Sequence, residues 1–294
     1  MKMFEEQLKQ ISEKIKEREL KKFYCLISHT HKRGIYFSSS KESMSFIKQK
    51  FHSFKKKPVY FLLKIGILQP FLNKVKLSKE LGDVIFTAGK ITCFNLKKNE
   101  VLSFPLNENR NKKFIASKMF QREVANYDFA PKVYEINGEV PYAKEELLQI
   151  YNDIDYINVF KKLKKYYYFV GIKKIPIKEY VINLKKELER QNIKNDLIDK
   201  QLDAFSKKEL DLLVTTLHGD FAKENTLVKN GELVFIDWNK YHGLIIGDII
   251  NFFRGEENLL KNKNFKKVLE LYPPTVQENI KVYLDLHNIF LLIK

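Results

Sequence analysis

Four residues in the last third of this sequence have the types and the spacing of a phosphoryl-transfer site. His218 and Asp220 open the string HGDFAKEN, which ends in Asn225, and Asp237 follows twelve residues later in LVFIDW. Phosphoryl transfer needs an acceptor hydroxyl held in line with the terminal phosphorus and cations that offset the phosphate charge. Asp220 is a carboxylate in a loop, where it can accept the proton of that hydroxyl. Asn225 and Asp237 offer the hard oxygen atoms that Mg²⁺ prefers.

A hairpin is expected between the two metal-binding candidates. The strings TLVKN and ELVFIDW read as strands, and Asn-Gly at 230–231 is a strong signal for a tight turn between them. Because a hairpin brings its two ends together, Asn225 and Asp237 can share one ion. We expect His218 to bond the backbone of the loop and hold Asp220 in place. The alternative, a buried histidine with no part in the chemistry, is the commoner role of a single histidine.

These residues resemble the catalytic motif and metal loop of the aminoglycoside phosphotransferase and choline kinase group, within the protein-kinase-like fold. That group has H-G-D-x-x-x-x-N, then I-D-W or I-D-F, then a Gly-Asp segment that opens a helix; here the last is IIGDIINFF at 245–253. The resemblance implies that Asp220 is the catalytic base, that Asn225 and Asp237 bind magnesium, and that Asp248 is a buried acid bracing the loop. It is specific over 217–253, and over 83–150 only the order of elements agrees.

The resemblance also implies a nucleotide site in the first half of the chain. Glu123, in FQREVANY, falls where the group's small-lobe helix carries a Glu. The partner of that Glu is a Lys on the third strand, where this chain has Ser103 or Phe104. Lys90 is another candidate for the phosphates, and Glu123 reads equally well as a solvated i,i+4 partner on its helix. Other lysines nearby are Lys97, Lys98, Lys112, Lys113 and Lys118.

The segment YAKEELL (142–148) would link the two lobes and line the adenine ring with Glu145, Glu146 and Leu147. The elements before it predict a small sheet with one helix against it. We expect strands at 83–90, 91–97, 100–106, 132–137 and 142–148, and a helix at 111–128.

Upstream, a helix at 4–20, a hairpin of strands 23–30 and 34–38, and a helix at 41–54 capped by Ser40 are expected. The segment 58–77 is ambiguous. After residue 150 helices dominate, at 153–166, 176–190, 195–214, 247–258, 262–271 and 275–293. The predicted fold is therefore α+β and two-lobed, with an extension of unclear role (1–80), a β-rich nucleotide-binding lobe (81–148) and a helical catalytic and acceptor-binding lobe (149–294).

The composition predicts a globular chain with anionic partners. Of 294 residues, 44% are hydrophobic, and 53 basic against 36 acidic residues give a net charge of +17. Such a field attracts nucleotides, phosphorylated sugars or an anionic surface, although an AT-rich genome that favours lysine codons explains the same excess. Cys25 and Cys93 make neither a disulfide framework nor a metal cluster, which fits a reducing compartment.

The chain is expected in the cytoplasm, and a peripheral contact with the inner face of a membrane stays open. Its first residues lack the apolar core of a signal peptide. The longest apolar stretch, 58–72, is interrupted by Lys64, Gln69 and Pro70, which makes it too polar to span a bilayer.

These observations predict a kinase that uses ATP, or another nucleoside triphosphate, and Mg²⁺. Its acceptor would be a hydroxyl of a small molecule or glycan, with an anionic sugar or a glycolipid precursor favoured. A catalytically inactive kinase-like scaffold that binds nucleic acid or an anionic membrane is one alternative. The missing strand lysine supports it, and the intact Asp220, Asn225 and Asp237 oppose it. Nucleic acid is not the expected partner. A protein kinase is a second alternative, opposed by HGD in place of HRD and IDW in place of DFG. The sequence leaves the oligomeric state open.

Overall fold

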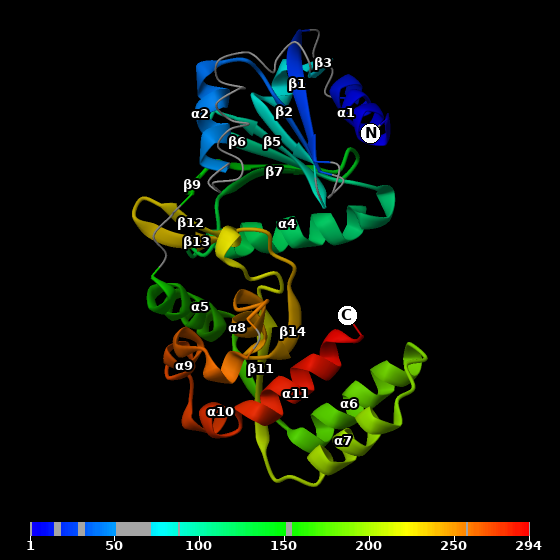
Figure 1. The fold of residues 1–294 in the computed structure, drawn as a ribbon, viewed down its shortest axis with the longest axis vertical. Coiled ribbons are helices and arrows are strands. Elements are labelled where there is room, and N and C mark those ends of the chain that lie inside the picture. Colours follow the sequence, from blue (N-terminus) through cyan, green and yellow to red (C-terminus); the bar gives the residue numbers. More distant parts are fainter. Residues whose placement is uncertain are drawn as a thin grey trace. The chain divides into compact units, whose positions relative to one another are not determined.

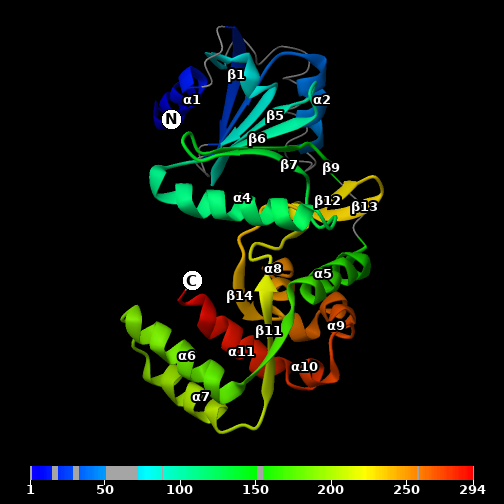
Figure 2. The same ribbon diagram turned by 180° about the vertical axis from the view of Figure 1, so that it is seen from behind.

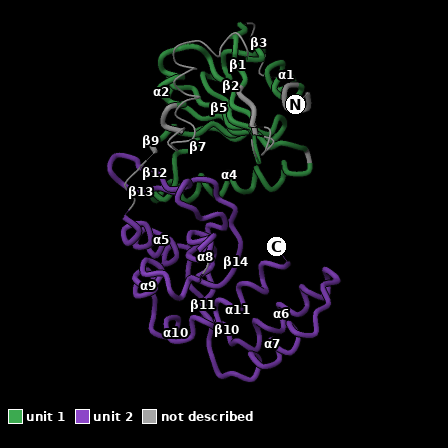
Figure 3. The backbone as a smooth tube through the Cα atoms, viewed as in Figure 1, with its two compact units in different colours: residues 1–149 green, residues 150–294 purple. Residues whose placement is uncertain are grey.

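The computed structural model describes residues 2–14, 19–28, 33–50, 72–87, 89–150, 155–256 and 258–293. The chain divides into two compact units, Met1–Gln149 and Ile150–Lys294 (Figures 1 and 3). The first unit is built on an antiparallel sheet and the second is mainly helical. The predicted α+β fold, with a β-rich first part and a helical second part, is confirmed.

The first unit contains an eight-stranded sheet in the order β3-β1-β2-β4-β5-β6-β8-β7. Its paired strands are antiparallel throughout. The strands are β1 (Leu20–Ser28), β2 (Arg33–Phe37), β3 (Asn73–Ser78), β4 (Val84–Thr87), β5 (Lys90–Asn95), β6 (Glu100–Pro105), β7 (Val133–Asn137) and β8 (Tyr142–Glu146).

The described part of the predicted extension 1–80 belongs to this sheet. It supplies β1, β2 and β3, and β3 lies in the segment whose structure the sequence left ambiguous. The rest of that segment, up to residue 71, lies outside the described residues. The extension therefore widens the sheet of the first unit, and the contacts place it in the same unit as residues 81–148.

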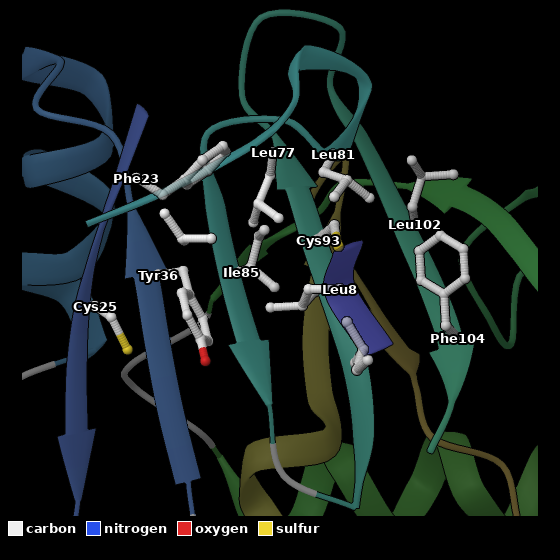
Figure 4. Close-up of a cluster of buried hydrophobic side chains, with 12 residues drawn as sticks. Leu8, Phe23, Cys25, Tyr36, Leu77, Leu81, Ile85, Cys93, Leu102 and Phe104 are labelled. Carbon is white, nitrogen blue, oxygen red and sulfur yellow. The ribbon is translucent and has the colours of Figure 1, made fainter. Parts of the chain in front are cut away.

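Helices α1 (Lys2–Lys14) and α2 (Lys41–Lys50) cover opposite faces of the sheet (Figures 1 and 2). Successive side chains of a strand point to opposite faces. Tyr36 accordingly packs in a cluster with Leu8 of α1, whereas Phe37 packs with Met44 and Ile47 of α2. Figure 4 shows Leu8 among the strand side chains of the first cluster. The described part of the predicted helix 4–20 is α1, residues 15–18 lie outside the described residues, and Leu20 belongs to β1.

A local signal marks the start of α2. The Ser43 amide donates to Ser40 Oγ at 3.1 Å, which confirms the predicted cap of α2. The helix α4 (Asn111–Ala125) follows the short 3₁₀ turn η4 (Glu108–Arg110), and another such turn, η3 (Lys79–Leu81), precedes β4.

The second unit is less purely helical than the sequence predicted. It contains an antiparallel sheet in the order β10-β11-β14 (Ile172–Pro176, Asp211–Leu217, Tyr241–Leu244). The predicted helix 195–214 is wrong beyond Ser206, where α7 ends. The string DLLVTTL forms β11 instead, because its β-branched residues fit a pleated strand and its neighbours on both sides satisfy the backbone.

The remaining elements of this unit follow the predicted order. A hairpin joins β12 (Thr226–Lys229) to β13 (Glu232–Phe235), and the two-residue strand β9 (Gln149–Ile150), which was not predicted from the sequence, pairs beside β12. The helices are α5 (Tyr156–Val170), α6 (Ile177–Arg190), α7 (Asp196–Ser206), α8 (Gly247–Phe252), α9 (Lys263–Leu269), α10 (Pro274–Glu278) and α11 (Ile280–Leu291), with 3₁₀ turns η5 (Lys223–Asn225) and η6 (Leu259–Lys261). No helix among the described residues has the length and apolar character that crossing a membrane requires.

Candidate functional site

The loop that carries Asp220 begins where β11 ends. Leu217 pairs with Tyr241 of β14, so the chain after Asp237 returns alongside the start of the loop. The Asn239 amide donates to the His218 carbonyl oxygen at 2.8 Å and ties the two segments together. Asp220 itself is exposed.

A buried carboxylate holds the backbone immediately before Asp220. Asp248, on α8, is fully buried. Its Oδ2 accepts hydrogen bonds from the His218 amide at 2.7 Å and from the Tyr167 hydroxyl at 3.0 Å, and its Oδ1 accepts one from the Gly219 amide at 2.9 Å. Hydrogen bonds to an ionised acceptor are about twice as strong as neutral ones. Asp248 thus braces the loop, in the way that the sequence resemblance implied.

Glycine is required at position 219. Its φ is +90°, a backbone conformation that other residues rarely adopt. A Cβ atom there would also collide with the Asn239 carbonyl oxygen. The close approach of the two segments therefore depends on this glycine.

His218 is buried and neutral. Burial lowers the pKa of His218 to about 4, although the negative charge of Asp237 raises it. The ring lies against Trp238, with centroids 4.4 Å apart, and its Nδ1 accepts a hydrogen bond from the Asp220 amide at 3.4 Å. The ring is thus enclosed, neutral and in contact with the backbone of Asp220.

The hairpin brings Asn225 and Asp237 to the same end of β12 and β13. Thr226 pairs with Phe235, and the Ile236 amide donates to the Asn225 carbonyl oxygen at 2.9 Å, so the two candidates flank one cross-strand contact. The turn residues Asn230 and Gly231 both have positive φ, at 50° and 83°. Positive φ at both positions is typical of the type I′ turn, and the predicted hairpin is confirmed.

The donor atoms fit a magnesium ion that is also bound by phosphates. The Asn225 Nδ2 donates to the Asp220 carbonyl oxygen at 2.7 Å, so the amide oxygen is the atom that could act as a metal ligand. Together with the Asp237 carboxylate it supplies the few hard oxygen ligands that Mg²⁺ takes beside phosphate and water. Among the described residues no group of three or more His, Cys, Asp or Glu side chains could hold a metal.

A cavity of about 590 Å³ opens beside Asp220 within the second unit. This volume suits a small molecule. Its lining includes two acidic residues, Asp220 and Glu224, and two basic residues, Lys223 and Arg254. Neither basic side chain forms an ion pair with any described carboxylate. Sequence reasoning missed Arg254, although it directly follows the IIGDIINFF string.

The predicted nucleotide residues lie in the first unit, and only some of them meet. Ser103, on β6, is buried and its hydroxyl donates to Glu145 Oε1 at 2.8 Å. Glu123 is exposed on α4 and is not part of this contact, which agrees with the alternative of a solvated helix residue. Lys90 is half-buried at the start of β5.

The backbone at Glu146 and Leu147 is bonded within the first unit. The Glu146 amide donates to the Lys132 carbonyl oxygen and the Leu147 amide to that of Asn99, both at 2.9 Å. Both amides therefore already donate to backbone carbonyl oxygens of the protein. The side chains of both residues are half-buried.

Comparison with known proteins adds a structural likeness. No family model matches the sequence, and no curated protein matches it. A choline/ethanolamine kinase family protein from Mesorhizobium loti is similar over 71% of this chain and 74% of its own, at 14% identity and a TM-score of 0.46. The choline kinase LicA from Streptococcus pneumoniae is similar over 70% and 80%, at 14% identity and a TM-score of 0.45.

A third solved structure is an aminoglycoside phosphotransferase from Streptomyces rimosus. It is similar over 68% of this chain and 89% of its own, at 9% identity and a TM-score of 0.43. Choline kinase-like proteins and aminoglycoside phosphotransferases are the group that the sequence motif resembles.

Proposed function

We propose that this protein is a kinase that transfers the terminal phosphoryl group of ATP, with Mg²⁺, to a hydroxyl of a small molecule or glycan. One observation carries the proposal. A buried carboxylate, Asp248, bonds the two backbone amides that precede Asp220, and Asn225 bonds the carbonyl of Asp220 itself. An exposed acid fixed this firmly beside a cavity suits a reaction in which positioning provides most of the catalysis.

Each residue then has a distinct task. Asp220 accepts the proton of the acceptor hydroxyl while the hydroxyl oxygen bonds to phosphorus and the bond from phosphorus to the nucleoside diphosphate breaks. His218 positions Asp220. Asn225 and Asp237 would hold Mg²⁺, which offsets charge on the phosphates when bound.

The acceptor is proposed to carry an anionic group, as a phosphorylated sugar or a glycolipid precursor does. Two observations support an anionic acceptor, one at the cavity and one for the whole chain. Arg254 and Lys223 line the cavity without a carboxylate partner among the described residues, and guanidinium groups bind phosphate and carboxylate in a paired geometry. The net charge of +17 adds a long-range attraction for anions.

The nucleotide is proposed to bind on the first unit. Lys90 would contact its phosphates, and Glu146 and Leu147 would lie beside its base. Ser103 and Glu123 are the weaker candidates, because Ser103 already bonds Glu145 and Glu123 faces solvent.

The decisive experiment replaces the base. We expect Asp220→Asn to lower the turnover about a hundredfold or more, as loss of a general base does, while ATP binding is retained. The assay incubates the protein with Mg²⁺, ATP and a panel of acceptors and follows the mass gain of one phosphoryl group. Asp203→Asn is the matched control, because Asp203 is an exposed acid on α7 that pairs with Lys185. An unchanged rate in Asp220→Asn would remove this residue from the role.

A further inference from the structure

Lysines stand opposite each other on the two neighbouring strands β1 and β3. Lys22 of β1 pairs directly with Lys76 of β3, and Tyr24 pairs with Lys74. Like charges directly opposite each other in a sheet are destabilising. The strands β1, β2 and β3 contain no Asp or Glu, so no carboxylate of these strands offsets that repulsion. The pairing of Lys22 with Lys76 therefore costs stability and calls for an explanation other than packing.

The three lysines lie on one face of the sheet. Successive side chains of a strand point to opposite faces. Phe23, next to Lys22, and Val75, between the two lysines of β3, pack in the cluster on the side of α1, where Figure 4 shows Phe23. Lys22, Lys74 and Lys76 therefore share the opposite face.

These lysines face solvent without carboxylate partners. All three are exposed, and none forms an ion pair with a carboxylate among the described residues. Lysines on an outer strand also keep sheets from pairing edge to edge. That explanation fits Lys74 and Lys76, because β3 is an outer strand of the described sheet. It does not fit Lys22, because β1 lies between β3 and β2.

An exposed apolar side chain belongs to the same face. Leu20 lies two residues before Lys22 on β1 and is 57% exposed. Lysines bind anionic lipid headgroups, and an apolar side chain beside them can enter the boundary between headgroups and acyl chains. The combination therefore fits an anionic bilayer.

A single-stranded nucleic acid fits this face less well, because its bases stack on exposed aromatic side chains. The aromatic residues of the three strands are enclosed: Phe23, Tyr36 and Phe37 are buried. Tyr24 is half-buried, with Lys22 Nζ 5.5 Å from its ring centroid. The face thus offers charge and one leucine, but no stacking platform.

We propose that this face of β1 and β3 docks on an anionic phospholipid membrane. Lys22, Lys74 and Lys76 contact the phosphate and carboxylate groups of the lipids, and Leu20 enters the headgroup boundary. The inference does not depend on the kinase reaction. It assigns a role to the described part of the segment 1–80, which adds β1, β2 and β3 to the sheet.

The first test neutralises the three lysines together. Sedimentation of the full chain with vesicles, at fixed ionic strength, compares phosphatidylcholine alone with phosphatidylcholine that contains phosphatidylserine. We expect the triple variant Lys22→Gln, Lys74→Gln, Lys76→Gln to bind the phosphatidylserine vesicles about a hundredfold more weakly than the wild type, at roughly fivefold per lysine. Thermal unfolding checks that the variant is folded, which exposed positions allow.

The matched control removes the same charge elsewhere. It is the triple variant Lys9→Gln, Lys200→Gln, Lys267→Gln, whose lysines are exposed on α1, α7 and α9. We expect this control to lose much less affinity than the first variant. Equal affinities of the two triple variants would overturn the proposal, as would a wild type that binds neither kind of vesicle.

The second test separates a membrane from a nucleic acid. Fluorescence anisotropy measures binding of a labelled single-stranded RNA and a labelled DNA duplex at the same ionic strength. We expect Leu20→Ser to weaken binding to phosphatidylserine vesicles several-fold, because it removes an apolar side chain from the headgroup boundary, and to leave binding of either nucleic acid unchanged. Nucleic-acid binding that the first triple variant loses, with no vesicle binding by the wild type, would assign the face to nucleic acid and overturn the proposal. Unchanged vesicle binding by Leu20→Ser would overturn the assignment of Leu20.

Discussion

Around Asp220, exposed side chains differ from buried side chains that hydrogen-bond the backbone of the loop. Asp220 is exposed, whereas His218 and Asp248 are fully buried. The spacing of the motif allowed the sequence to assign these roles, because Asp248 follows in the same specific stretch. Arg254 directly follows the IIGDIINFF string, but its place at the cavity depends on tertiary packing, so the sequence alone did not single it out.

The buried histidine gives the protein a defined response to acid. The pKa of His218 is about 4 in the folded state and 6.5 in its ordinary range. Between these values the unfolded chain binds a proton at this site and the folded chain does not. The lowered pKa of His218 therefore makes the free energy of unfolding depend on pH. Its contribution is fully present above pH 6.5 and is lost as the pH falls toward 4, by roughly 3 kcal/mol in total.

Urea unfolding between pH 4 and 7 measures this effect. We expect the free energy of unfolding of the wild type to decline more steeply than that of His218→Gln, whose side chain does not titrate. Parallel curves for the two proteins would contradict the assigned pKa.

At the scale of elements, the sequence predicted the hairpin and the helix start that depend on local signals, but it did not predict the sheet that depends on long-range strand pairing. The Asn-Gly turn predicted the hairpin of β12 and β13, and Ser40 predicted the start of α2. Between β10 and β11 the chain forms the helices α6 and α7, and between β11 and β14 it forms the hairpin of β12 and β13; pairing across such stretches leaves no short-range pattern. The loop bearing Asp220 is anchored by this unpredicted sheet, so the residues of the site were more predictable than their support.

The hairpin turn is expected to influence metal binding at its other end. Gly231 has a φ of +83°, so Gly231→Ala strains the turn at a cost of about 1 kcal/mol. A distorted hairpin shifts Asn225 relative to Asp237. We therefore expect ATP binding to need several-fold more Mg²⁺, as measured by calorimetry over a magnesium titration.

Two further variants bracket this result. Gly138→Ala is the control, because a Cβ there meets open space and its φ lies outside the left-handed range. Asp237→Ala, which removes a proposed ligand outright, should abolish the magnesium dependence. If Gly231→Ala required the same magnesium concentration as the control, the geometry of the turn would have no influence on metal binding.

At the scale of the whole molecule, net charge acts over distances that no single side chain covers. A charge of +17 raises the local concentration of anions and speeds their encounter, and salt screens this attraction over about 10 Å at 0.1 M ionic strength. Contacts inside a cavity are screened less. A change of salt concentration therefore separates the attraction exerted by the whole chain from the proposed recognition of an anionic acceptor by Arg254.

We expect kcat/KM for an anionic acceptor to fall about tenfold when the ionic strength rises from about 0.02 to 0.2 M, because steered association weakens steeply with salt. The turnover number kcat should change little, since a bound acceptor no longer depends on encounter. A neutral analogue that lacks the charged group is the control and should respond less than about twofold. Arg254→Gln should lower kcat/KM for the anionic acceptor at both salt concentrations while leaving the salt dependence nearly intact, because it removes one charge of a large excess. If the anionic and neutral acceptors respond equally to salt, the positive charge of the chain has no part in acceptor choice.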